Sequence, residues 1–267
     1  MRTLASPVTW MESRRLLTMI LLGALLWSLA SVDWQDGVLH ARGLAALREI
    51  ACAVFRPDLS WETLGKLVTS AWRTVAYAMA GLSLALLIGF PLGLLASGVL
   101  NRSLAKRRAV QAVARFVLGF LRAIHELVWA WLFVAAIGLS PLAAVLALAI
   151  PYGGILGRIY AELFQDVPEA PLRALRNAGA SEWRVFWYGR LPAVLPELIG
   201  YTFYRLECGI RSATVLSFVG LGGLGFQIGI ALDDLAYGRA WTFILGLVGL
   251  IVLVEAWSGV VRRKVIL

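Results

Sequence analysis

The sequence predicts an all-α polytopic membrane protein with about six transmembrane helices, and three observations support this fold class. Charged residues make up 15% of the 267-residue chain, against about 25% in an average soluble domain. Hydrophobic residues make up 60%, too many for a water-facing surface or for intrinsic disorder. Stretches free of charge recur along the chain, most of them near the roughly 20 residues that a spanning helix needs.

These charge-free stretches predict the spans in order. The first follows Arg14 and Arg15, and we expect an uncleaved anchor there; a signal peptide cleaved after Ala30 is the alternative. Ser140-Pro141 favours a turn, which divides the long apolar stretch after Leu127 into two helices. The expected spans are 16–32, 74–101, about 114–138, 142–162, 194–218 and 240–259.

Basic residues predict the orientation of these spans. With the N-terminus inside the cell, the cytoplasmic segments hold 16 of the 25 Lys and Arg residues. This excess follows the positive-inside rule, so most of the net charge of +9 is an orientation signal and we expect no nucleic-acid partner. We divide the chain into an anchor and outer segment at 1–69, a transmembrane domain at 70–260 with a cytoplasmic loop at 164–196, and a basic cytoplasmic tail at 261–267.

The sequence contains no recognisable catalytic or metal-binding constellation. There is no Gly-x-Ser-x-Gly elbow, no phosphate-binding loop of the Walker type, and no cluster of Cys and His at metal-ligand spacing. We therefore expect no catalytic residue, no metal site and no cofactor bound by this chain. A membrane enzyme or scaffold remains a minor alternative.

Charged residues within the expected spans are candidates for function, since each is costly in hydrocarbon. Arg122 and Glu126 are spaced to pair on one helical face, as are Glu207 and Arg211, while Arg205 is left over. The pairs could hold helices together. Alternatively, the surplus positive charge could line a path for an anion.

A glycine-dense segment follows the fifth span. Gly220, Gly222, Gly223 and Gly225 fall within six residues, which disfavours a straight helix. We expect a re-entrant or broken helix that lines a cavity, with a plain outer loop as the alternative.

The 164–196 loop is expected to form two short helices. Pro171 can start the first and Gly179 can end it. Ser181 can cap the second, whose apolar face would be Val185, Phe186 and Tyr188, with an end near Gly189 and Pro192. Because the chain has no ATP site of its own, such a docking element indicates an ATPase partner.

This loop resembles the cytoplasmic loop of binding-protein-dependent ABC permeases, whose core reads Glu-Ala-Ala, three residues, Gly, nine residues, Ile-x-Leu-Pro. Gly179 and Leu191-Pro192 match at the correct spacing, which places Arg173-Ala174-Leu175 on the Glu-Ala-Ala and Gly189 on the Ile. Glu169, one turn upstream, could partly replace the missing carboxylate. The stretches 191–197, 201–216 and 219–225 resemble phosphonate permeases of that family, as does 122–130, with His125 where Pro is expected.

The resemblance implies the type I ABC importer permease fold, in the bacterial inner membrane with both termini cytoplasmic. It implies a homodimer, two ATP-binding cassette subunits that hold ATP and Mg, and a periplasmic phosphonate-binding protein. The cargo would be phosphonate or a phosphite-like oxyanion; phosphate or an amino acid is the alternative. The implied ATPase-coupling residues are Glu169, Arg173, Ala174, Gly179, Ala180, Ser181, Leu191 and Pro192. The implied path or gate residues are Arg122, Glu126, Arg205, Glu207, Arg211, Gly220, Gly222, Gly223 and Gly225.

Overall fold

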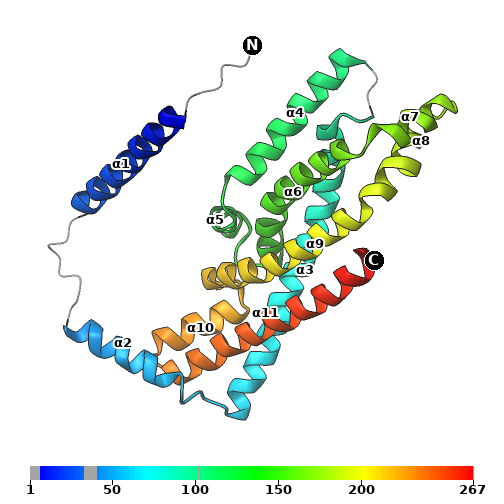
Figure 1. Cartoon of the computed structure of the whole chain (residues 1–267). Helices are drawn as coiled ribbons and strands as arrows, with labels where there is room; N and C mark the ends of the chain where they lie inside the picture. The colour runs from blue at the N-terminus through cyan, green and yellow to red at the C-terminus, as the bar shows by residue number, and fades with distance from the viewer. Residues whose placement is uncertain (1–6, 33–40, 101–102, 267) are drawn as a thin grey trace. The chain divides into compact units, whose positions relative to one another are not determined.

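The computed structural model describes residues 7–32, 41–100 and 103–266 (Figure 1). All regular structure within these residues is helical, as the composition predicts. The chain forms two compact units, Met1–Cys52 and Ala53–Leu267. Asn101 and Arg102, at the expected end of the second span, lie outside the described residues.

The first unit holds α1 (Pro7–Ser31) and almost all of α2 (Ala41–Ala53). The stretch Arg14–Ser31 of α1 is apolar enough to cross a membrane, in agreement with the first expected span. The expected division of the chain at residue 69 falls inside a helix of the second unit, and it stays a prediction.

The first half of the second unit holds the helices α3 to α6, of which α3 and α6 are each long and apolar enough to span a membrane. α3 (Trp61–Ser97) starts well before Thr74, the expected start of this span, because the Ser60 hydroxyl caps it by accepting from Thr63 N. α4 (Leu104–Ala123) and α5 (Glu126–Ile137) follow, and α6 (Pro141–Asp166) begins at the expected Ser140-Pro141 turn. Ser140 caps α6 by accepting from Ala143 N at 3.3 Å.

The prediction of one continuous helix over 114–138 is wrong. The axes of α4 and α5 are bent by 83° at Ile124 and His125. His125 adopts an extended backbone, and its imidazole Nδ1 accepts from Leu127 N at 3.3 Å, which caps α5 as a new helix.

The C-terminal half consists of helices joined by tight breaks. α7 (Glu169–Asn177) and α8 (Glu182–Val185) lead through a π-helical turn, Phe186–Arg190, into α9 (Leu191–Leu216). A second π-helical turn, Ser217–Leu221, precedes α10 (Leu224–Asp233) and then α11 (Tyr237–Ile266). Among the described residues, four helices are long and apolar enough to span a membrane, and two bent pairs raise the total to six.

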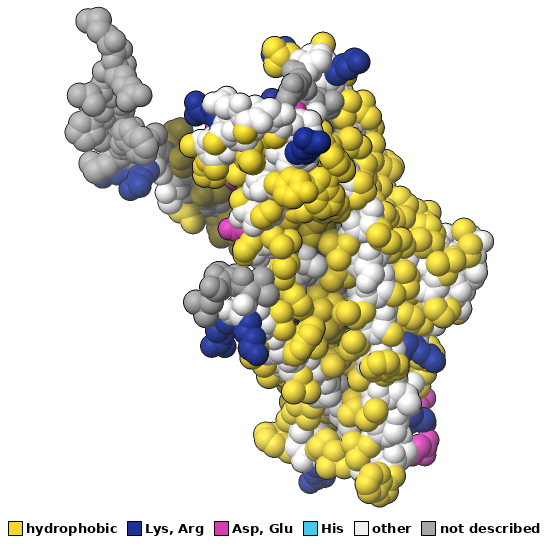
Figure 2. All heavy atoms as spheres, turned by 90° about the vertical axis from the view of Figure 1, so that its right-hand side faces the viewer, with side chains coloured by type: hydrophobic (Ala, Val, Ile, Leu, Met, Phe, Trp, Pro, Cys, Tyr) yellow, Lys and Arg dark blue, Asp and Glu magenta, His cyan; other side chains and the backbone are white. Residues whose placement is uncertain are grey.

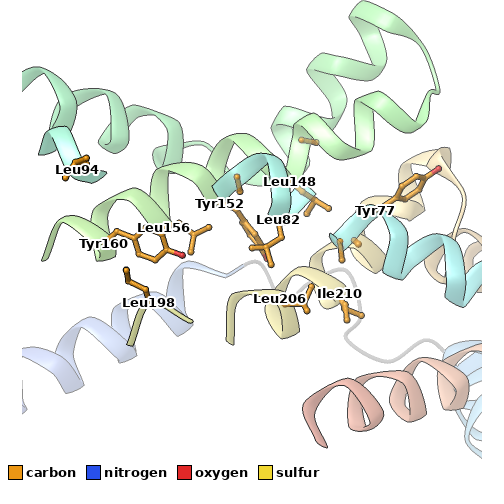
Figure 3. Close-up of a cluster of buried hydrophobic side chains, with 14 of the residues drawn as sticks. Tyr77, Leu82, Leu94, Leu148, Tyr152, Leu156, Tyr160, Leu198, Leu206 and Ile210 are labelled. Atoms are coloured by element: carbon orange, nitrogen blue, oxygen red, sulfur yellow. The ribbon is translucent and has the colours of Figure 1, made fainter. Parts of the chain in front are cut away.

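Close packing of α3 on α6 builds the core. Cβ atoms placed on Gly89 and Gly93 would lie 2.8 Å from the Gly153 carbonyl oxygen and 2.6 Å from that of Gly157. Only glycine permits this approach, the small-residue helix contact typical of membrane proteins. Leu82, Leu148, Tyr152, Leu206 and Ile210 pack beside it, from α3, α6 and α9 (Figure 3).

Large hydrophobic side chains also cover much of the outer surface, as a lipid-facing surface requires. Hydrophobic groups predominate on the face shown in Figure 2. On α11, Val252 and Leu253 are more than half exposed.

Candidate functional site

The loop between α6 and α9 folds as two short helices joined at Gly179, as expected. Gly179 has φ of +82°, and its N–H donates to Arg176 O, which closes the C-terminus of α7. Ser181 then caps α8 by accepting from Arg184 N at 3.5 Å. Ala180 is half-buried between these two caps.

Three details of the expected loop are wrong. The first helix starts at Glu169, two residues before Pro171. The second does not end near Gly189, because the π-helical turn carries it into α9, with Pro192 in the first turn of that helix. Tyr188 is 78% exposed and leaves the apolar face, since the wider turn shifts the positions of the residues around the helix.

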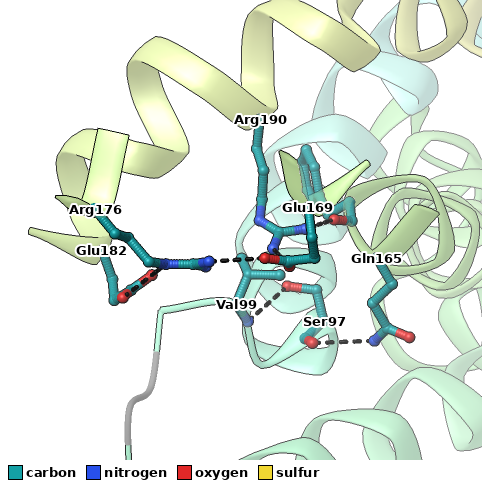
Figure 4. A network of polar contacts seen from close by, with 8 residues as sticks. Ser97, Val99, Gln165, Glu169, Arg176, Glu182 and Arg190 are labelled. Carbon is teal, nitrogen blue, oxygen red and sulfur yellow. Dashed lines mark hydrogen bonds and ion pairs between the residues drawn. The ribbon is translucent and has the colours of Figure 1, made fainter. Parts of the chain in front are cut away.

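A network of ion pairs that sequence reasoning missed holds the loop together (Figure 4). Arg190 is only 5% exposed; its guanidinium donates to Glu169 Oε1 at 2.9 Å and to the Phe164 carbonyl oxygen at the end of α6. Arg176 donates to Glu169 Oε2 at 2.7 Å and to Glu182 at 3.2 Å. The only signal of this network in the sequence is a basic residue directly before Leu191-Pro192.

Within this network, Glu169 is the acceptor for two arginines. Hydrogen bonding to Arg176, with a further contribution from Arg190, lowers the pKa of the Glu169 carboxyl below its ordinary value. Burial lowers the pKa of the Arg190 guanidinium, and Glu169 opposes that effect. Both carboxylate oxygens of Glu169 are therefore engaged inside the loop, so this residue supports α7 internally.

The remaining loop positions differ in exposure. Arg173 and Ala174 are exposed on the outer side of α7, and Pro192 is exposed on α9. Leu191 is half-buried against the core. A Cβ on Gly189 would lie 2.8 Å from Leu172 Cδ2 and 2.9 Å from Leu175 Cδ1. Glycine at this motif position thus lets α7 pack close to the π-helical turn.

The glycine-dense segment forms a break between two helices bent by 53°. Gly220, Gly222 and Gly223 have φ of +101°, +77° and +114°, which other residues rarely adopt. Gly225 fits against α9, because a Cβ there would lie 2.0 Å from the Thr214 carbonyl oxygen.

Polar side chains from α3 and from the π-helical turn itself hold this break in place. Thr74 Oγ1 accepts from Leu224 N at 3.0 Å, and the Tyr77 hydroxyl donates to Leu221 O at 3.0 Å. Ser217 Oγ accepts from Gly225 N at 3.0 Å. The Arg73 guanidinium lies against Gly222. The break is therefore a fixed element of the fold, and its contacts with α3 were not part of the sequence prediction.

The expected charge pairs within the spans are wrong. Arg122 and Glu126 are separated by the bend between α4 and α5, so the spacing rule for one helix does not apply. Glu126 instead accepts from Ser212 Oγ at 2.7 Å, and Ser212 accepts from the Tyr152 hydroxyl at 3.0 Å. Glu207 pairs with Arg262 of α11 at 3.0 Å, which leaves Arg211 exposed on α9.

Arg205 is held by aromatic rings. Its guanidinium lies 5.1 Å from the ring centroid of Tyr152, 5.6 Å from that of Tyr201 and 5.9 Å from that of Tyr204. It also donates to the Tyr201 hydroxyl at 2.9 Å. Thus Arg205, Tyr152, Ser212 and Glu126 form one connected polar group between α5, α6 and α9. Arg122 lies apart, in a cleft between α4 and α6.

Comparison with known proteins agrees with this geometry. Residues 89–267 match the family of binding-protein-dependent transport system inner membrane components. The phosphite transport system permease protein PtxC of Stutzerimonas stutzeri is 33% identical over 86% of this chain and 83% of its own. The phosphate-import permease protein PhnE of Mycolicibacterium smegmatis is 36% identical over 72% of this chain and 36% of its own.

A solved structure supports the fold. The permease chain in an inward-facing conformation of the MetNI methionine ABC transporter superposes with a TM-score of 0.69 at 21% identity, over 78% of this chain and 99% of that one. This likeness concerns the fold alone. The chain belongs to the family of binding-protein-dependent transport system inner membrane components, as a permease subunit of a type I ABC importer rather than an enzyme.

Proposed function

We propose that this permease carries phosphonate or a phosphite-like oxyanion across the bacterial inner membrane. The names of its relatives support this cargo, since PtxC is a phosphite permease and PhnE a phosphate-import permease. The charges in the spans agree with an anion: Arg122, Arg205 and Arg211 exceed Glu126 and Glu207, and Glu207 is already paired with Arg262. Phosphate and amino acids are the competing cargoes.

The observation that carries the proposed mechanism is the set of bonds from Arg190 to Glu169 and Phe164 O, which we call the Arg190 clamp. Arg190 ties α7 to the end of α6 through Glu169 and Phe164 O, and it directly precedes α9. An ATPase that moved the loop would therefore move α9 with it. α9 carries Arg205 and Glu207 and leads into the glycine break. Loop motion would thus reach the proposed path.

We assign the energy source to two partner ATPase subunits, which would bind ATP and Mg and dock on the 164–196 loop. A second copy of this permease would complete the path, and a periplasmic binding protein would deliver the cargo. The excess of basic residues on one side supports cytoplasmic termini.

The central test is ATP-dependent uptake in proteoliposomes with phosphonates, phosphite, phosphate and methionine as cargoes. We expect uptake of phosphonate or phosphite when the ATPase and binding protein are present. Preferred uptake of phosphate or methionine would refute the cargo. Absence of a co-purifying ATPase together with absence of uptake would refute the transport assignment. Cross-linking of two differently tagged copies tests the homodimer.

Gly179→Asp tests the docking loop. A Cβ at Gly179 meets no atom within 4 Å, so the new side chain would project away from the fold, at a φ that Asp rarely adopts. We expect weaker ATPase co-purification with normal membrane insertion. Gly179→Asn is the matched control, because Asn tolerates this backbone better and adds no charge. Full co-purification and uptake in the Asp variant would contradict the assignment of the loop.

Arg211→Leu tests the proposed translocation path, because this residue is exposed and its replacement should not disturb folding. We expect lower uptake with normal assembly. Unchanged uptake would remove Arg211 from the proposed path.

A further inference from the structure

A basic cleft lies between α4 and α6, beside the C-terminus of α3, and none of the expected ATPase-coupling residues lines it. Its volume is about 400 Å³, within the range of about 300–1,000 Å³ typical of small-ligand sites. Its charged lining residues are Arg115, Arg122, Arg158 and Glu162. Three guanidinium groups therefore face one carboxylate.

These guanidinium groups are only partly engaged within the part of the chain that the structure describes. Arg158 Nε donates to Glu162 at 2.9 Å, and both side chains are about half exposed. Arg115 uses Nε to donate to Ala96 O at 3.3 Å. The side chain of Arg122 has no ion pair or hydrogen bond with any described residue. The cleft thus presents a surplus of positive charge and N–H donors.

The wall of the cleft is built in advance of any ligand. Besides the bond from Arg115 to Ala96 O, Gln111 and Gln165 both donate to Ser97 O, at 2.9 Å and 3.0 Å. Together these side chains hold the end of α3 against α4 and α6. Ala96, Leu118 and Ala161 also line the cleft and belong to one buried apolar cluster. The helices that carry the three arginines are therefore packed together, with small residues beside the guanidinium groups.

We propose that this cleft binds a phosphate-type oxyanion. Arginine recognises phosphate oxygens through paired N–H donors, and basic pockets between membrane helices on the cytoplasmic side bind anionic head groups. The group could belong to an anionic phospholipid or to free phosphate or phosphonate, since both present the same oxygens. The site lies next to the coupling loop, because Gln165 in its lining directly follows Phe164, the acceptor from Arg190.

Two sets of probes distinguish the sources. Native mass spectrometry on the full-length permease in its complex measures how much lipid the protein retains. The amount of retained phosphatidylglycerol, which is anionic, is compared with that of phosphatidylcholine, which is zwitterionic. Free anions are tested by equilibrium dialysis of inorganic phosphate and methylphosphonate in a zwitterionic detergent without anionic lipid. The lipid assay does not involve the transported solute. Phosphate and methylphosphonate resemble the proposed cargo, so for these two probes Arg158→Gln and Gly119→Leu, which alter no proposed path residue, separate the cleft from the path.

Three variants perturb the cleft in different ways. Arg122→Gln and Arg158→Gln each remove one charge. Gly119→Leu fills the cleft, since a Cβ at this lining position meets no atom within 4 Å and packing is left intact. Arg263→Gln is the matched control: this exposed arginine lies near the end of α11, and among the described residues its side chain bonds only to Gly259 O of its own helix.

We expect each cleft variant to weaken binding of at least one probe about tenfold or more, a change of about 1.4 kcal/mol. Loss confined to phosphatidylglycerol identifies a head-group site, and loss of phosphate or methylphosphonate identifies a free-anion site. Unchanged binding of every probe in all three variants, with normal unfolding temperatures, would overturn the proposal. An equal loss in Arg263→Gln would also overturn it, because binding would then follow overall charge.

Discussion

Replacing Glu169 with Gln should loosen the coupling loop. Arg190 is almost fully buried and depends on Glu169 for a charged partner at 2.9 Å, so the substitution leaves a buried guanidinium without its counter-charge. Removing one partner of a fully buried pair costs about 3–5 kcal/mol. The Glu169 side chain is 50% exposed, so water offsets part of this cost, and Gln keeps one acceptor oxygen. We expect a loss of about 1–2 kcal/mol, around the lower end of the range of about 1.5–3 kcal/mol for hydrogen bonds to charged groups.

Hydrogen exchange of the α7 amides measures this loss directly, on the full chain in lipid nanodiscs. A local loss of 1–2 kcal/mol raises the population of the open state by a factor of about 5–30. Exchange in Glu169–Asn177 should accelerate by that factor. Glu62→Gln is the matched control: Glu62 pairs with Lys66 at 2.6 Å, but its side chain is 78% exposed, and such surface pairs contribute about 0–1 kcal/mol.

The effect should also depend on pH with a definite sign. The arginines lower the pKa of Glu169 in the folded loop, so its contribution is fully present above the unfolded value of about 4.3. It is lost as pH falls through the lower folded value. The difference between the parent and Glu169→Gln should therefore be constant near neutral pH and shrink below about pH 4. Unchanged α7 exchange in Glu169→Gln at neutral pH would refute the clamp.

Two further predictions concern helix packing and the glycine break. Gly93→Leu should separate α3 from α6, because a Cβ would lie 2.6 Å from Gly157 O. Overpacking of this kind lowers the free energy of unfolding by about 1–3 kcal/mol or more. The unfolding temperature should therefore fall. Gly65→Leu in the same helix meets open space and should leave it unchanged. Thr74→Val should lower the stability of the glycine break by about 1–3 kcal/mol, because it leaves the buried Leu224 N–H without an acceptor. Faster hydrogen exchange of the Leu224 amide would measure this loss. Unchanged exchange would contradict the role of Thr74.

Features set by local chemistry were predictable from the sequence. The caps at Gly179 and Ser181 and the turn at Ser140-Pro141 follow from backbone preferences and short-range hydrogen bonds, and all three occur where expected. The spanning segments follow from hydropathy, because each must satisfy its backbone within one helix. Helix ends were less predictable: α3 begins before Thr74, since the cap at Ser60 starts the helix ahead of its charge-free part.

The side-chain partners were not predictable, because they depend on elements distant in sequence. The rule that residues four apart pair on one helix fails for Arg122 and Glu126, since extended backbone at Ile124 and His125 separates two helices bent by 83°. Glu207 had a suitable neighbour on its own helix, yet pairs with Arg262 of α11 across 55 residues. Tertiary packing decided which charge came within reach.

The sequence by itself determined that this chain is a helical membrane protein, where its apolar segments lie, and which loop resembles an ABC permease docking element. These properties depend on composition, hydropathy and spacing along the chain. Only the tertiary structure decided that Glu169 serves Arg190 inside the loop, that Thr74 and Tyr77 anchor the glycine break, and that Arg115, Arg122 and Arg158 share one cleft. The reason is physical: burial and contact between distant helices determine which polar groups must find partners and which remain available for a ligand.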